Sequence, residues 1–149
     1  MRERRNLALM SRLVVVQRAR RLGAEAQLQR AAAAEQEARD AETEALARAA
    51  ASREDWANHL ERPGFSPEYG RALSVRLLVR ASEADSATSA ADRTTEATDR
   101  SRQAWRLLEA QVRQAEGSVR KLRRKVGQAA EEKRLAELSE RTTWAWSRR

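Results

Sequence analysis

The chain has 149 residues, a length typical of one domain, and it carries a net charge of +8. Charged residues make up 35% and aromatic residues 4%, a composition that suits long helices and excludes a thick globular core. Without cysteine, the chain cannot form a disulfide framework or a thiolate metal site. The longest aliphatic run, Leu13 to Val16, is far too short for membrane insertion. We therefore expect one soluble cytoplasmic domain spanning residues 1–149.

The first expected element is a helix over residues 3–61. Steps of three and four residues from Leu7 trace a line of 16 positions, which we call the first seam, and ten of them are apolar. Such a period of 3.5 residues is typical of a coiled-coil helix. The first seam consists of Leu7, Met10, Val14, Gln17, Arg21, Ala24, Leu28, Ala31, Glu35, Ala38, Glu42, Ala45, Ala49, Ser52, Trp56 and His59.

A turn is expected at residues 62–66. Arg62 precedes a proline, which disfavours helical backbone, and Gly64 can adopt the conformations that a reversal needs. Ser66 is a good N-cap, and Pro67 suits the first position of the helix that follows. A connection this short usually joins antiparallel helices.

The second expected helix spans residues 67–143 and is followed by a tail, residues 144–149, that can fray. Its seam, which we call the second seam, has 21 positions, and 14 of them are apolar. They are Leu73, Leu77, Arg80, Ala84, Ala87, Ala91, Thr94, Thr98, Ser101, Trp105, Leu108, Val112, Ala115, Val119, Leu122, Val126, Ala129, Lys133, Ala136, Glu140 and Thr143.

The two seams predict an all-α fold, in which two long helices form an antiparallel coiled-coil hairpin and the second helix is longer. If the turn centres between residues 64 and 65, residue i faces residue 129 minus i, and seam positions meet seam positions, as Ala45 meets Ala84. The alternative is a flexible joint between two coils that dimerise independently. In the hairpin, small residues line the middle, so that part is thin and marginally stable, and the last 20 or so residues have no partner within the chain.

The sequence offers little for catalysis. His59 is the only histidine, and its simplest interpretation is a seam or surface residue. The glycines are isolated, so no phosphate-binding loop is expected, and the serines lack a histidine base. We expect no enzyme activity, no catalytic residue, no cofactor and no metal site.

The strongest electrostatic feature is the basic run at residues 120–125. The segment 81–99 carries a net charge of −4, whereas residues 100–149 carry +8. Two interpretations stay open: a solvated flank of the helix, or a surface that binds an anionic partner. No aromatic residue is interleaved with the run, which argues against specific nucleic-acid reading. At the turn, Trp56, Phe65 and Tyr69 crowd together, either to cover the turn or to dock a second partner.

The length, the expected hairpin and the segment Trp105–Arg141 resemble the FliJ/YscO family, the central-stalk proteins of flagellar and type III secretion export ATPases. The likeness lies in Val119-Arg120-Lys121-Leu122-Arg123 and in Glu131-Glu132-Lys133-Arg134-Leu135 with the residues up to Arg141. Where the family has an Asp-Glu pair before a hydrophobic residue, this chain has Ala136-Glu137-Leu138.

The resemblance implies a stalk that couples a hexameric secretion ATPase to an export-gate protein and can bind secretion chaperones. It implies a cytoplasmic protein, at most peripheral at the inner face of the inner membrane. The ring would contact Arg2, Arg4, Arg5, Arg120, Lys121, Arg123, Arg124, Lys125, Glu137 and Leu138. The export gate would contact Trp56, Arg62, Phe65 and Tyr69. The rival hypotheses are a basic coiled coil that binds nucleic acid and a structural coiled coil that dimerises or tethers.

Overall fold

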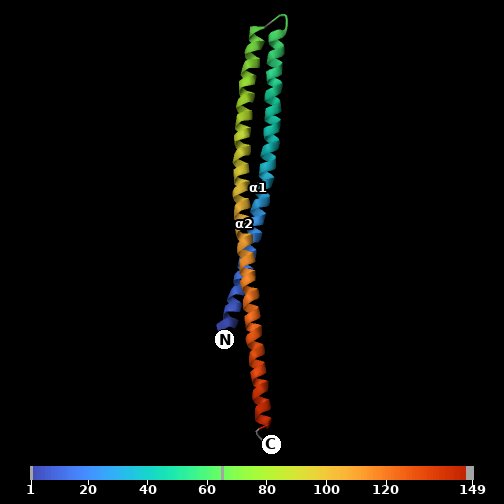
Figure 1. The fold of residues 1–149 in the computed structure, drawn as a ribbon. Coiled ribbons are helices and arrows are strands. Elements are labelled where there is room, and N and C mark those ends of the chain that lie inside the picture. The colour runs from blue at the N-terminus through green and yellow to red at the C-terminus, as the bar shows by residue number, and fades with distance from the viewer. Residues whose placement is uncertain (1, 65, 147–149) are drawn as a thin grey trace. The chain divides into compact units, whose positions relative to one another are not determined.

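The computed structural model describes residues 2–64 and 66–146, except for the side chains of Arg2 and Ala145. Two helices make up nearly all of this part: α1, Arg2–Glu61, and α2, Pro67–Trp146 (Figure 1). No strand occurs among the described residues. The expected fold class, a hairpin of two helices with the second one longer, is confirmed. Neither helix, within the described residues, contains a stretch long and apolar enough to cross a membrane.

The start of α2 follows the capping chemistry expected of Ser66. The Tyr69 backbone N–H donates to the Ser66 hydroxyl oxygen at 3.4 Å, and the Gly70 N–H donates to the Ser66 carbonyl oxygen at 2.9 Å. Pro67 is the first helical residue, where its missing N–H costs nothing. Gly64 has a φ of +99°, a backbone conformation that a side chain would strain. Ser66 and Gly64 therefore define the reversal.

Burial follows the two seams. All 16 positions of the first seam are buried or half-buried, and so is every position of the second seam from Leu73 to Val126. The second seam is exposed from Ala129 onward. The helices therefore pack along the lines expected from the sequence, and α2 continues beyond them as a bare helix. It ends at Trp146 rather than at Thr143, so residues 144–146 are helical, while residues 147–149 lie outside the described part.

The chain forms two compact units. The turn unit is Glu25–Ala104, and its antiparallel helices enclose a core of small residues that includes Ala45, Ala49 and Ala84. Ala45 and Ala84 share one cluster, as the expected register requires. With alanine at these positions little apolar surface is removed from water, at roughly 25 cal/mol per Å².

The terminal unit is Met1–Ala24 with Trp105–Arg149. Its core is built from larger side chains: Val14 lies against Ala115 and Val119, and Leu7 and Met10 pack on this cluster. Val14 and Ala115 are partners in the expected register, so the helices of this unit follow the same register as those of the turn unit. The bulkier residues make this the better-packed unit.

Candidate partner-binding surfaces

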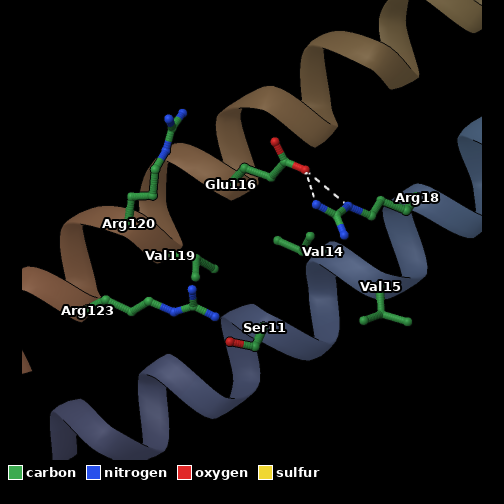
Figure 2. Close-up of a pocket in the computed structure, with 8 residues that line it drawn as sticks. All are labelled: Ser11, Val14, Val15, Arg18, Glu116, Val119, Arg120 and Arg123. Carbon is green, nitrogen blue, oxygen red and sulfur yellow. Dashed lines mark hydrogen bonds and ion pairs between the residues drawn. The ribbon is translucent and has the colours of Figure 1, made fainter.

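The terminal unit has a shallow groove of about 410 Å³ along one side of the helix pair. Val14 and Val119 come from the seams, and the groove is rimmed by polar and basic residues (Figure 2). The lining residues are Ser11, Val14, Val15, Arg18, Glu116, Val119, Arg120 and Arg123. The groove thus combines an apolar floor with a mostly cationic rim, which fits an acidic amphipathic segment better than a small metabolite.

Among the described residues of this unit, two ion pairs connect the helices. The Arg18 guanidinium donates to the Glu116 carboxylate at 2.6 and 3.0 Å, at the edge of the groove (Figure 2). Farther along, Arg21 donates to Glu109 at 3.1 Å. This hydrogen bond lowers the pKa of Glu109 below its ordinary value of 4.5, because it stabilises the charged carboxylate. Each of these glutamates is paired with an arginine, so neither of them offsets the positive charge of the other arginines and lysines in the unit.

The basic run is placed unevenly around α2. Arg123 extends across the groove toward Ser11 on α1, whereas Arg120 points away from α1 (Figure 2). Lys121, Arg124 and Lys125 are exposed on α2, and Leu122 is half-buried in the seam. The charged side chains of the run therefore spread over the exposed sides of α2, and only Arg120 and Arg123 line the groove.

The basic residues near the start of α1 lie in the same unit. Arg4 and Arg5 are exposed, and Arg4 lines a second groove with Val126, Ala129 and Lys133 of α2. The structure thus places Arg4 one to two turns beyond the basic run, near the point where α1 begins. The Arg2 side chain lies outside the described residues.

Past Val126, α2 is exposed on all sides that the structure describes. Leu135 and Trp146 are 66% and 80% exposed, and Leu138 is 49% exposed. Glu137 forms an i,i+4 ion pair with Lys133 at 3.7 Å. Exposed leucine and tryptophan on a bare helix are the residue types that anchor protein contacts. We call residues 129–146 the overhang.

The turn places its aromatic residues in different environments. Trp56 is half-buried at its seam position, and Leu73, its partner in the expected register, is buried. Tyr69 is 55% exposed and Arg62 is exposed. Phe65 lies outside the described residues.

His59 does more at the turn than sequence reasoning assigned to it. It is buried, its Nε2 donates to the Ser66 carbonyl oxygen at 3.2 Å, and its ring meets that of Tyr69 edge-on at 4.9 Å. The histidine therefore ties the end of α1 to the cap of α2. The seam position of His59 was visible in the sequence, but its hydrogen bond depends on the conformation of the turn.

Sequence reasoning also missed a polar layer between the helices of the turn unit. Thr95 donates to the Glu35 carboxylate at 2.9 Å and accepts from Arg39 at 3.0 Å, and Arg39 also pairs with Glu42 at 2.9 Å. Hydrogen bonds from Thr95 and Thr98 lower the pKa of Glu35, and the bond from Arg39 does so for Glu42. The available signal was glutamate at two first-seam positions opposite threonines near the second seam.

The described residues contain no group of three or more histidine, cysteine or acidic side chains that could hold a metal ion. Three buried polar atoms lack a hydrogen-bond partner within the described part: Gln17 Oε1, Arg21 Nε and Trp105 Nε1. All three residues belong to the seams of the terminal unit, and Gln17 also lines a groove of that unit with Met10 and Gln114. The features available for binding a partner are therefore the charged groove of the terminal unit and the exposed apolar side chains of the overhang.

Comparison of this chain with protein-family models, with curated proteins and with solved structures finds no match.

Proposed function

We propose that the chain is a non-enzymatic stalk protein whose terminal unit binds a hexameric secretion ATPase. The observation that carries the proposal is the overhang, where α2 continues past the start of α1 and exposes Leu135, Leu138 and Trp146. A single helix with apolar anchors and flanking charges can enter a narrow opening that a broader domain cannot. The FliJ/YscO resemblance of the same segment supplies the identity of the ring.

The basic run supports the same assignment. Arg120, Arg123 and Arg124 are exposed near the base of the overhang, where they would meet acidic residues around the opening of a ring. Exposed charges of this kind chiefly steer association and set its salt dependence. The proposal extends to the turn unit, whose exposed Tyr69 and Arg62 would contact an export-gate protein or a chaperone.

The test measures binding to, and stimulation of, the ATPase of a type III export system from the same genome. Reversing the charge at Arg120, Arg123 and Arg124 to glutamate should weaken binding about tenfold or more, since three favourable contacts become repulsive. The matched control reverses the exposed Arg30, Arg53 and Arg93 of the turn unit, which changes the net charge equally. Equal effects of both variants, or of neither, would reject the assignment.

Substitutions in the overhang provide a second test in the same ATPase assay. Replacing Leu135 and Leu138 with serine should abolish stimulation while leaving helical content nearly unchanged, because both side chains are exposed in the isolated chain. A basic coiled coil that binds nucleic acid is the rival function. It requires DNA affinity that falls steeply with salt, insensitive to the leucine substitutions. That outcome would replace the stalk proposal.

A further inference from the structure

The side of α1 that faces away from its seam is apolar within the terminal unit. Leu9, Val15 and Val16 are 58%, 65% and 49% exposed, and Ala8 is exposed as well. These four residues stand three or four positions from Arg12, the spacing of neighbours on a helix surface, so they surround its exposed side chain. We call Ala8, Leu9, Arg12, Val15 and Val16 the outer patch. This side of an amphipathic helix is usually polar, so aliphatic residues gathered here indicate a contact outside the helix pair.

The outer patch lies opposite the side of α1 that packs on α2. Arg12 is two residues from both Met10 and Val14 of the first seam, and two residues of an α-helix turn the chain by about 200°. Val14 is buried and Met10 is half-buried, whereas every residue of the outer patch is exposed. Because α1 packs on α2 through the seam, nothing in the described part of the terminal unit covers the patch.

Unpaired positive charge accompanies the outer patch. Residues 4–22 contain six arginines and no acidic residue. Arg18 and Arg21 are paired with Glu116 and Glu109 of α2. The other four arginines are exposed and take part in no ion pair within the described residues: Arg4, Arg5, Arg12 and Arg20. Their charge is therefore available to an anionic partner.

The arrangement of charge and apolar surface favours a membrane over a macromolecule. Arg12 stands in the middle of the aliphatic residues, so a protein helix laid on the patch would bury its guanidinium, which costs free energy unless a carboxylate meets it directly. A second copy of the chain would place arginine against arginine. Nucleic acid would attract the arginines but leave the aliphatic side chains in water. At a lipid surface, aliphatic side chains enter the boundary between headgroups and acyl chains, while the stem of an arginine lies along them and its guanidinium reaches the phosphates.

We propose that the outer patch binds the surface of a bilayer that contains anionic lipids, with α1 lying parallel to the membrane. Leu9, Val15 and Val16 enter the headgroup region, and Arg12 and Arg20 contact lipid phosphates. The patch contains no tryptophan or tyrosine, the usual interfacial anchors, so binding is reversible and depends on anionic lipid. The contact is with lipid itself, and it is independent of the stalk proposal.

Co-sedimentation of the full chain with vesicles tests the proposal. At about 0.1 M salt the chain should bind vesicles of phosphatidylcholine with about 30% phosphatidylserine at least about tenfold more tightly than vesicles of phosphatidylcholine alone. Binding to the anionic vesicles should weaken as the salt concentration rises toward 1 M, where the screening length falls to about 3 Å. A chain that does not bind the anionic vesicles would overturn the proposal and leave an acidic helical protein as the occupant of the patch.

A matched pair of variants tests the charge of the patch. Arg12→Gln combined with Arg20→Gln should weaken binding to the anionic vesicles at least about tenfold, because each arginine near an anionic surface contributes to binding. The control, Arg30→Gln combined with Arg53→Gln, removes two exposed arginines of the turn unit that also take part in no ion pair within the described residues. Equal effects of the two variants would show that the vesicles respond to net charge alone and would overturn the proposal.

Aliphatic contact distinguishes membrane binding from attraction between charges alone. Replacing Leu9, Val15 and Val16 with serine should weaken vesicle binding at least about tenfold, because apolar surface is no longer removed from water. The control makes the same change at one leucine and two valines of the turn unit that are similarly exposed: Leu78, Val75 and Val79. Circular dichroism checks that all variants remain helical. A patch variant that binds the anionic vesicles as tightly as the wild type would show a purely electrostatic attachment and contradict the proposal.

A fluorescent probe tests which surface enters the membrane, and the absence of cysteine allows single labelling sites. An environment-sensitive dye attached to Val16→Cys should shift its emission to shorter wavelength on the anionic vesicles. Val79→Cys is the control in the turn unit, because Val16 and Val79 are 49% and 50% exposed, and the emission of its dye should stay constant. A shift at Val79→Cys without one at Val16→Cys would place another surface on the membrane and reject the assignment to the outer patch. Because no ATPase is present, each outcome leaves the stalk proposal untouched.

Discussion

Single polar side chains connect α1 and α2 where the seams lack large apolar residues. Glu35 of α1 accepts from Thr95 of α2 in the turn unit, and Glu109 of α2 accepts from Arg21 of α1 in the terminal unit. Glu42, also at a seam position, accepts from Arg39 of its own helix. In each case the hydrogen bond stabilises the charged carboxylate more than the protonated carboxyl group, and the pKa is lowered as a result. Ionisation of these three carboxyl groups therefore stabilises the folded chain.

The sign of the pH dependence follows from these shifts. A carboxyl group with a lowered pKa in the folded chain stabilises it fully above the ordinary value of 4.5 and loses this effect as the pH falls through the folded pKa. We therefore expect the urea midpoint to be constant between pH 7 and about 5 and to fall below about 4.5. Urea titrations followed by circular dichroism measure it.

The control for this prediction removes the three groups. The variant carrying Glu35→Gln, Glu42→Gln and Glu109→Gln should be less stable at pH 7 and should show a shallower loss of stability in acid. Repulsion among the many arginines also grows as other carboxylates are protonated. If the triple variant loses stability in acid as steeply as the wild type, that general repulsion, and not these three groups, governs the acid response.

At the scale of the elements, the glycines in the helices contrast with the one in the turn. A Cβ added at Gly23 or Gly127 would meet no atom within 4 Å, and both residues are helical. A Cβ at Gly64 would also meet none, but its φ of +99° disfavours any side chain. Open space is therefore not what distinguishes the three positions; backbone conformation is.

We expect opposite effects of alanine at these positions. Gly23→Ala should raise the free energy of unfolding by roughly 1 kcal/mol through helix propensity. Gly64→Ala should lower it by about 1 kcal/mol, because the left-handed backbone is strained for a residue with a Cβ. Thermal or urea unfolding of each variant measures the change. A stabilising Gly64→Ala would show that the turn adopts another conformation in solution.

At the scale of the whole molecule, packing differs between the two units. The terminal unit buries Val14, Val112 and Val119, whereas the turn unit buries mostly alanine along its length, with Thr98 only 1% exposed. Each additional buried methylene contributes about 0.8 kcal/mol, so the turn unit gains less from burial per turn of helix. Its polar layer at Glu35 and Thr95 offsets part of the difference.

This difference predicts uneven local stability. Amides of α2 at residues 84–98 should exchange hydrogen faster than those at residues 108–122, because openings of the alanine-lined unit expose less apolar surface. Hydrogen exchange followed by mass spectrometry compares the two peptides in one sample. Equal protection of both peptides would mean that the polar layer compensates fully for the missing apolar area.

Much of the fold was predictable because a coiled coil is a local pattern repeated many times. The steps of three and four residues located both buried lines, from Leu7 to His59 and from Leu73 to Val126, and the proline and glycine of the turn located the reversal. The candidate surfaces were less predictable. The basic run was evident, but the sequence did not show that Arg123 crosses a groove while Arg120 points away (Figure 2).

The sequence by itself determined the two helices, the seam along which each helix is buried, and the greater length of α2. Each of these depends only on residue spacing along one chain. The tertiary structure alone decided which polar groups meet: Arg18 with Glu116, Thr95 with Glu35, and His59 with the cap at Ser66. These contacts depend on how far one helix is shifted along the other and on side-chain rotamers. A heptad period fixes the buried side of each helix but leaves both of those open.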